Sequence, residues 1–466
     1  MTGDREPTLA ARVEPNQPQA RRSAAVLITL YIHLFPALHR TIFSFLFGSP
    51  EKQTRISTTM LVSLIACPSS LADANSVENP LNREPPIKEL VREFITEAST
   101  AYDRNHSAFP HIDGETFRLR VDGGVRNVLE LSIDTLRNDF SQHEVISALQ
   151  CAGNRRHTMR TKVKEVDGID WNDGAVCNCT WRGPLLADIL AKANISMEGN
   201  VHVAFNCFQA DCQDDTFYGS SIPLERCMDK SKQVILALEM NGRPLTINHG
   251  FPLRAVMPGI AGARWTKWLD HITVQCTESL NYYMQKDYKI LPPCVETKQQ
   301  ALEYWPRVPA IQGLPINSII AYPESNTTIS PKELTAEGEL EVCGYALPQA
   351  DDGPVVKVEV SADGGKSWAE AEIVFPPNRE WDTPEGKTKY KWAWAIWKYK
   401  LPQAKKITQE TTIWSRATDA GGNTQDGTIP WNYRGVAYNA YGEATGLQIW
   451  DNRQKELVNG VGGLKL

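Results

Sequence analysis

The stretch that decides the fold reads ALQCAGNRRHTM and runs from Ala148 to Met159. Its single thiol, Cys151, precedes two small residues, an amide, two arginines and a histidine. Small residues let the backbone approach a large ligand closely, and cationic neighbours favour the thiolate, which is the form that binds metal. A free cysteine taken alone is more often a buried core residue than a ligand. The whole string from Cys151 to Arg156 is therefore the signal, rather than the thiol by itself.

Length and composition indicate a globular protein of more than one domain. A chain of 466 residues is too long for one ordinary core, so we expect two domains and additional segments. Hydrophobic residues make up 42% and charged residues 22%, as in other globular proteins. The net charge of −6 gives no reason to expect nucleic acid or an acidic membrane surface as a partner. A small anionic substrate would need local cations.

The ten cysteines do not form a pattern typical of a disulfide framework in a chain of this length. Cys177 and Cys179 are close in sequence, as are Cys207 and Cys212, but neither pair has the two-residue spacing of common structural zinc sites. We therefore disfavour zinc and expect a reducing or neutral compartment.

The two ends of the chain carry candidate targeting signals. Residues 15–50 contain three arginines and no acid, around an apolar run at 24–38 that is too short for a confident membrane span. This composition favours a mitochondrial targeting segment, although acids precede it and a mis-joined exon would look similar. We predict that 1–75 is a targeting or poorly ordered extension. The C-terminal Leu464-Lys465-Leu466 approximates a peroxisomal signal, so peroxisomal or cytosolic location is the alternative to mitochondrial.

Between residues 76 and 300, short helices and strands alternate. Apolar residues follow Pro85-Pro86 at helical spacing from Ile87 to Ala98, which predicts a helix there. Residues 117–121 alternate like a strand, and leucines and an isoleucine at 185–190 mark another helix. The region is predicted to be α+β.

After residue 300 the pattern changes to short strands separated by Gly and Asp turns. Valines alternate with polar residues from Val356 to Val360, and Asp363-Gly364-Gly365 predicts a turn. Residues 301–466 are therefore predicted to form a β-sandwich domain.

Four further segments contain unusual concentrations of polar and aromatic groups: 102–106, 248–269, 286–289 and 431–436. The longest, NHGFPLRAVMPGIAGARWTKWL, has three glycines and two prolines that let the backbone wrap a ligand. Its cations, which include Arg264, would supply hydrogen-bond donors to a phosphate.

Taken with the cysteine segment, these motifs resemble in order those of the sulfite oxidase family, which includes the molybdenum domain of assimilatory nitrate reductases. The resemblance covers roughly residues 79–440. It departs from the family pattern at Asn248, where an aspartate is usual. We find neither a Gly-x-Gly-x-x-Gly fingerprint nor a His-Pro-Gly-Gly haem segment, and no flavin module, so the chain is most similar to the haem-free, plant-type members.

The resemblance implies an α+β molybdopterin-binding domain (sulfite oxidase middle-domain fold) at 76–300, followed by an immunoglobulin-like β-sandwich dimerisation domain at 301–466. It implies a molybdenum-molybdopterin cofactor without haem or flavin on this chain, and Cys151 as the metal ligand. The residues that it assigns to the pterin and its phosphate are Tyr102, Asp103, Arg104, Asn105, His106, Asp211, His249, Arg254, Trp265, Thr266 and Lys267. Those that it places around the substrate are Arg104, Arg156, Trp171 as an apolar wall, Tyr288 and Arg434.

The implied activity is oxidation of sulfite to sulfate by oxo transfer in a homodimer. Arginines suit such a substrate because their planar fork matches an oxyanion. Electrons would pass to oxygen, as in the plant type, or to cytochrome c. The alternatives are an enzyme acting on another oxyanion such as nitrate, and a non-catalytic pterin-binding homologue.

Overall fold

The computed structural model describes residue 77 and residues 79–449. Contacts divide the chain into Met1–Pro68 and Ser69–Leu466, and the fold below is that of the second unit. The targeting predictions for 1–75 and 464–466 lie outside the described residues. Within the described part, no helix is both long and apolar enough to cross a membrane.

The cysteine segment follows a long antiparallel pair of strands. β3 (Gln142–Gln150) pairs with β4 (Val176–Pro184) along all nine residues, so that Gln150 lies opposite Val176. β4 has buried side chains on both faces and continues the sheet to β8 (Glu239–Met240) and β9 (Arg243–Pro244). β3 ends immediately before Cys151. The thiol is therefore placed at the end of the long β3–β4 strand pair.

A second, mixed sheet and several short helices complete this half. The sheet order is β2 (Leu129–Leu131), β1 (Leu119–Gly123), β11 (His271–Gln275), β5 (His202–Cys207) and β6 (Tyr218–Pro223), with only β1 and β11 parallel. The helices are α5 (Ile133–Asn138), α6 (Arg156–Lys162), α7 (Leu186–Ala193), α8 (Leu224–Met228), α9 (Tyr282–Gln285) and α10 (Lys298–Tyr304). A small pair joins β7 (Ile235–Ala237) to β10 (Arg254–Val256). The predicted α+β class is confirmed, and the predicted helix at 185–190 is α7.

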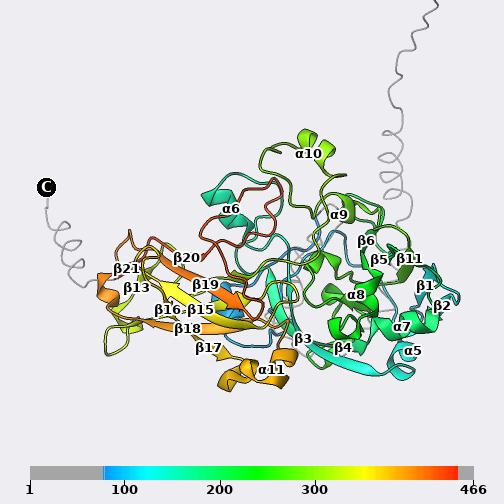
Figure 1. Ribbon diagram of the computed structural model, residues 1–466, viewed down its shortest axis with the longest axis horizontal. Coiled ribbons are helices and arrows are strands. Elements are labelled where there is room, and N and C mark those ends of the chain that lie inside the picture. The colour runs from blue at the N-terminus through cyan, green and yellow to red at the C-terminus, as the bar shows by residue number, and fades with distance from the viewer. Residues whose placement is uncertain (1–76, 78, 450–466) are drawn as a thin grey trace, which may run out of the picture. The chain divides into compact units, whose positions relative to one another are not determined.

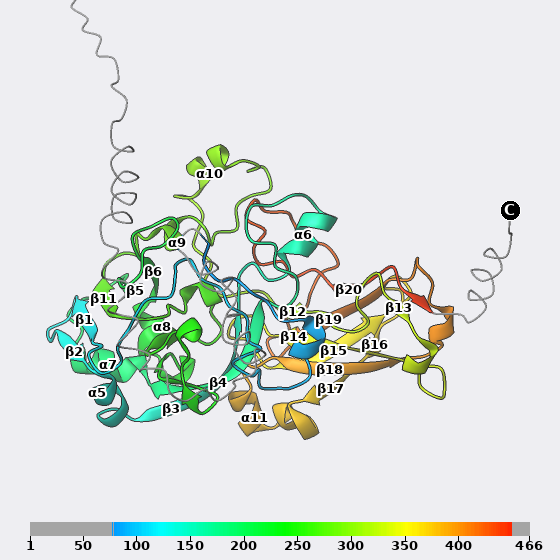
Figure 2. The ribbon, with the colours of Figure 1, turned by 180° about the vertical axis from the view of Figure 1, so that it is seen from behind.

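The later half is a sandwich of two four-stranded sheets, as predicted. One has the order β12 (Asn317–Ser318), β14 (Leu340–Leu347), β18 (Ala395–Leu401), β17 (Glu372–Phe375). The other has the order β16 (Ala369–Glu370), β15 (Val355–Ser361), β19 (Ile413–Asp419), β20 (Gly442–Ala444), and β13 (Thr328–Ile329) pairs with β21 (Gln448–Ile449). α11 (Pro384–Lys389) precedes β18. Figures 1 and 2 show these strands gathered on one side of the unit and the mixed sheet on the other.

The helix predicted from Ile87 to Ala98 is wrong beyond its first turn. α4 spans only Ile87–Leu90. The next backbone groups bond across the fold instead: Thr96 N–H donates to the Asn178 carbonyl (2.8 Å), and the Phe94 carbonyl accepts from the Asn178 amide (2.9 Å) and the Trp394 indole (2.8 Å). Tertiary partners on β4 and near β18 replace the intrahelical bonds, although the apolar spacing suits a helix.

The last segment before β20 returns to the first, α+β half. In Figures 1 and 2 this red segment lies beside α6. The Arg156 Nε–H donates to the Arg434 carbonyl (2.9 Å), and the Ala437 N–H donates to the Ala152 carbonyl (2.8 Å). Residues about 280 positions apart are thereby brought against the cysteine segment.

Candidate functional site

Two cavities meet at Cys151. The first has about 780 Å³ of space including its open mouth, within the range of ligand-binding pockets. The second opens beside it and is lined mainly by polar side chains. The residues common to both linings are Arg104, His106, Cys151 and Tyr288.

The backbone around Cys151 is held by bonds to neighbouring segments. Its N–H donates to the Ala175 carbonyl (2.9 Å), and its side chain is buried. Asn154 accepts from the Ala175 N–H (3.1 Å) and donates to the Tyr345 hydroxyl (2.8 Å) in the sandwich. The chain then turns at Arg155, which has a left-handed φ of 66°. These bonds keep the thiol at the junction of the two cavities.

The first cavity contains a buried arginine between two indoles. The Arg254 guanidinium lies 4.9 Å from the Trp181 ring centroid and 5.9 Å from that of Trp265. It donates to the His249 carbonyl (3.0 Å), while its Nε is buried and has no hydrogen-bond partner among the described residues. Burial lowers the pKa of Arg254 to about 10. An anionic or hydrogen-bond-accepting ligand would satisfy this donor.

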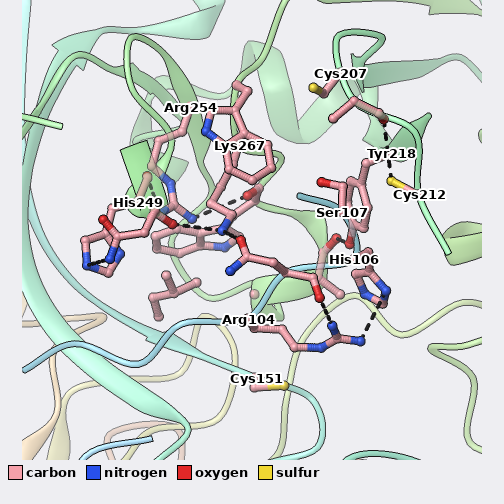
Figure 3. A pocket seen from close by; sticks show the side chains of 18 of the residues that line it. Arg104, His106, Ser107, Cys151, Cys207, Cys212, Tyr218, His249, Arg254 and Lys267 are labelled. Atoms are coloured by element: carbon pink, nitrogen blue, oxygen red, sulfur yellow. Dashed lines mark hydrogen bonds between the residues drawn. The ribbon is translucent and has the colours of Figure 1, made fainter. Parts of the chain in front are cut away.

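A lysine and a histidine lie near that arginine. Figure 3 shows Arg254, Lys267 and His249 on one side of the drawn residues and Cys151 and Arg104 on the other. Lys267 donates to the Asn105 side-chain oxygen and to the Asn248 carbonyl (2.8 Å). Burial and the neighbouring Arg254 lower the pKa of Lys267 to about 7, and burial lowers the pKa of His249 to about 4. Arg254 stays charged at neutral pH, so this end of the cavity suits a phosphate group.

The second cavity contains the three predicted substrate arginines. The Arg156 guanidinium donates to the carbonyls of Arg434 (2.9 Å) and Ile169 (2.7 Å), and burial lowers its pKa to about 10. Arg104 donates to the Asn82 side chain (3.2 Å) and approaches Nδ1 of His106 (3.1 Å). The structure therefore brings Arg104, Arg156 and Arg434 together beside Cys151.

Arg104, His106 and Tyr288 form a hydrogen-bonded series. A guanidinium can only donate, so Nδ1 of His106 accepts from Arg104 and its Nε2–H donates to the Tyr288 hydroxyl oxygen (2.8 Å). Burial holds the pKa of His106 well below its ordinary value, which keeps this neutral tautomer. Burial also raises the pKa of Tyr288 to about 12. The hydroxyl hydrogen of Tyr288 is thus free to point at a ligand.

Two carboxylates hold Arg434. Its Nη1 lies 2.5 Å from Asp167 and its Nη2 lies 3.3 Å from Asp287. Burial alone would lower the pKa of Arg434, but the two carboxylates raise it above its ordinary value. Sequence reasoning missed Asp167 as a lining residue. Asp167 lies four residues before Trp171, and this closeness to a predicted site residue was the available sign that it lines the same cavity.

Trp171 was predicted to be an apolar wall, and it lines the second cavity. Its ring meets Tyr102 edge-on at 6.4 Å between centroids, and it is buried. Its indole Nε1–H is buried too, without a hydrogen-bond partner in the part of the chain that the structure describes. The side chain therefore also offers a donor to a ligand.

Three of the predicted pterin residues are absent from the linings of both cavities: Asp103, Asp211 and Thr266. The Asp103 carboxylate accepts from Arg83 (2.9 Å) and from the Asn248 amide (2.7 Å). The Thr266 hydroxyl bonds to Phe205 and Ser220. Asp211 is exposed. The other eight predicted pterin residues line the first cavity: Tyr102, Arg104, Asn105, His106, His249, Arg254, Trp265 and Lys267.

Asn248, the departure from the family pattern, has a physical partner in Asp103. An amide can donate to that buried carboxylate, whereas an ionised aspartate could not. Sequence reasoning also missed Ser107, Cys207, Cys212 and Tyr218 in the first cavity. Cys207 and Cys212 were considered only as zinc ligands. Among the described residues, no group of three or more His, Cys, Asp or Glu side chains could hold a metal ion by itself.

A thiol lies between a cationic cavity and an arginine-lined cavity, and this arrangement suits the class of proteins that hold a large anionic cofactor beside an oxyanion site. Two family models match the chain, the oxidoreductase molybdopterin binding domain at 106–283 and the Mo-co oxidoreductase dimerisation domain at 308–444. They confirm the predicted order of the two folds.

Comparison with individual proteins also indicates this family. Sulfite oxidase of Arabidopsis thaliana is 34% identical over 78% of this chain and 90% of its own length. Human mitochondrial sulfite oxidase is 39% identical over 78% of this chain, which spans 64% of that protein. The sulfane dehydrogenase SoxCD structure from Paracoccus pantotrophus shares the fold, with 22% identity, a TM-score of 0.60, and coverage of 85% of this chain and 96% of that one. The chain belongs to the sulfite oxidase family.

Proposed function

We propose that this protein oxidises sulfite to sulfate with a molybdenum-molybdopterin cofactor whose metal is ligated by Cys151. The observation that carries the proposal is the position of Cys151, where a cationic cavity of cofactor size meets a cavity lined by three arginines. The 34% identity to a sulfite oxidase over 90% of that relative's length supports it.

The residues present fit the cofactor. Arg254 has a buried Nε without a partner among the described side chains and backbone, in a cavity that also contains Lys267 and His249. These groups would hold the phosphate and pterin, because charge-assisted hydrogen bonds to phosphate are strong. A soft thiolate suits the metal. When bound, the cofactor supplies the oxygen atom that sulfite receives and accepts the two electrons released.

The chain's own residues bind and orient the substrate. The guanidinium groups of Arg104, Arg156 and Arg434 would neutralise the oxyanion, and the Trp171 indole N–H would add one more donor. Because His106 donates to the Tyr288 oxygen, the Tyr288 hydroxyl hydrogen can be donated to the substrate. Its pKa of about 12 keeps that hydrogen in place at neutral pH.

The proposal is tested with purified holoprotein. We expect about one molybdenum and one pterin per chain, and sulfite-dependent turnover. Cys151→Ser should abolish turnover, whereas Cys294→Ser, which changes an exposed thiol outside both cavities, should not. Metal-loaded protein that turns over nitrate but not sulfite would favour the nitrate alternative. Loaded protein without any turnover would favour the non-catalytic homologue.

The electron acceptor is the finer part of the proposal. We propose oxygen, with hydrogen peroxide as the product, because the sequence pattern is most similar to the plant type. Parallel assays of sulfite-dependent oxygen uptake and cytochrome c reduction decide between the two acceptors. A rate with cytochrome c far above that with oxygen would overturn this choice.

Location and assembly are proposed on similar grounds. The match to the dimerisation model supports a homodimer, which sedimentation would detect as twice the chain mass of 52.1 kDa. Relatives named mitochondrial support mitochondrial location. Deleting residues 1–75 should then abolish import of a fluorescent fusion while turnover persists. Peroxisomal fluorescence that requires residues 464–466 would contradict this assignment.

A further inference from the structure

The second cavity contains opposing charges as well as donors for an anion. Arg434 has two carboxylate partners, Asp167 at 2.5 Å and Asp287 at 3.3 Å, and all three residues line the cavity. The Nε of Arg434 is buried and has no partner among the described residues. Any oxyanion that contacts this guanidinium must therefore share it with carboxylates already bound.

The two carboxylates differ in their access to water. The Asp287 side chain is 8% exposed, whereas that of Asp167 is 48% exposed. Asp167 is positioned by its backbone, whose N–H donates to the Tyr433 carbonyl (2.9 Å) next to Arg434. A half-exposed carboxylate is already largely hydrated, so separation from its partner costs little. Asp167 can therefore give way to an anion, whereas the buried Asp287 is the fixed partner.

Resting on the function proposed above, we propose that Asp167 sets the anion affinity of the site by competing with the oxyanion for Arg434. While it is bound, it lowers the positive charge of the cavity by one and blocks one edge of the guanidinium. An entering anion must displace it, and it returns to Arg434 as the anion leaves. The carboxylate thereby weakens the binding of substrate and of sulfate alike, and it favours release of the product.

The charge argument gives the direction of the change. Asp167→Asn removes a negative charge beside the site and leaves Arg434 Nη1 with a weaker, neutral acceptor, so anions should bind more tightly. Because solvent screens a half-exposed charge, we expect about a fivefold effect rather than a hundredfold one. Binding of sulfite and sulfate should tighten together, so KM and the sulfate inhibition constant should both fall. The turnover number should stay the same, or fall if product release becomes limiting.

The matched control is Asp170→Asn. Asp170 is three residues further on, its side chain is 45% exposed, and it pairs with Arg160 at 2.6 Å, but it lines neither cavity. Asp167→Glu keeps the charge and should retain most of the wild-type behaviour. Thermal unfolding of each holoprotein checks that the variants are folded.

Two measurements are made on the holoproteins: steady-state kinetics with sulfite, with sulfate as inhibitor, and calorimetric titration with inorganic sulfate alone. About fivefold lower KM and sulfate Kd in Asp167→Asn, with neither altered in Asp170→Asn, would support the inference. Unchanged sulfate affinity in Asp167→Asn, or an equal change in Asp170→Asn, would overturn it. Lack of sulfite turnover by the wild-type protein would refute the proposed function, whereas the sulfate titration would still decide the role of Asp167.

Discussion

Three glycines determine where the side chain of Arg156 lies. A Cβ on Gly153 or Gly168 would lie 2.6 or 2.7 Å from the Arg156 Cζ, and one on Gly435 would lie 2.8 Å from its Cγ. Real Cβ atoms do not approach other atoms so closely. The glycines come from the cysteine segment, the following loop and the returning segment. The position of this proposed substrate arginine therefore depends on residues without side chains.

Gly168→Ala should displace the Arg156 guanidinium. We expect KM for sulfite to rise about tenfold, because small misplacements of binding groups are costly, while molybdenum and pterin content stay near normal. Gly168 has a φ of 143°, so backbone strain needs its own control. Gly199→Ala supplies it, since Gly199 has a φ of 88° and no atom within 4 Å of the added Cβ. Equal kinetic effects of the two substitutions would attribute the change to strain.

His249 makes the stability of cofactor-free protein dependent on pH. Its folded-state pKa of about 4 lies below the ordinary 6.5. Between these values the unfolded chain binds a proton that the folded protein does not, so stability is full above pH 6.5 and is lost as the pH falls toward 4. By linkage, the free energy of unfolding should be about 2 kcal/mol lower at pH 5 than at pH 7 from this residue alone.

Urea unfolding of cofactor-free protein at pH 7 and pH 5 measures this loss. His249→Gln removes the titrating group and keeps a donor for the Ala98 carbonyl, which His249 Nε2 contacts at 2.8 Å. The variant should lose about 2 kcal/mol less than wild type between the two pH values. Identical losses in both proteins would show that other groups dominate the acid sensitivity.

At the scale of the element, β4 decides the conformation of a segment that resembles a helix in sequence. Its Asn178 is fully buried. The Asn178 side chain donates to the Phe94 carbonyl and accepts from the backbone N–H of Trp394 (3.4 Å). Thr96 bonds to the backbone of the same residue through both its N–H and its hydroxyl. One side chain and its backbone thereby join three segments, and they hold residues 94–96 against β4 in a non-helical conformation.

Asn178→Ala should lower the free energy of unfolding by about 1–3 kcal/mol, because it leaves the buried backbone N–H of Trp394 without an acceptor. Thr180→Ala, two residues along the same strand at a half-buried position, is the control and should cost less. Urea unfolding of both variants provides the comparison. A cost no greater than that of Thr180→Ala would show that Asn178 is not the organising residue.

At the scale of the whole described unit, one buried arginine joins the α+β half to the sandwich. Arg155 donates to the Asn317 side chain (2.8 Å) and to the carbonyls of Ala440 and Tyr441 (2.8 Å for Tyr441), and its guanidinium lies 4.8 Å from the Tyr438 ring centroid. It directly precedes Arg156. The same backbone turn thus attaches the sandwich and orients the proposed substrate arginine, Arg156.

Arg155→Met should lower the free energy of unfolding by about 3 kcal/mol or more, because it strands buried acceptors in the sandwich. We also expect sulfite KM to rise, because Arg156 depends on the same turn. Arg160→Met is the matched control, since among the described residues Arg160 pairs only with groups between 165 and 170. Comparable destabilisation by both substitutions would contradict a special role for Arg155.

Much of the fold followed from local patterns. Alternation of apolar residues predicted β1 and the strands of the sandwich, and helical spacing predicted α7. The same spacing failed after Leu90, because backbone groups there bond to β4 rather than to each other. Periodicity records which face of a segment is apolar and contains no information on which distant group competes for its hydrogen bonds.

For the site, the sequence alone determined the chemical types: one thiol, the arginines and the order of the motifs that the family shares. Their assignment to metal, pterin and substrate stays a prediction. Only the tertiary structure decided which side chains face the cavities. Asp103 binds Arg83 and Asn248 instead, and Arg434 shares its charge with Asp167, 267 residues away. Side-chain direction and net charge depend on contacts between remote segments, and local composition cannot specify those contacts.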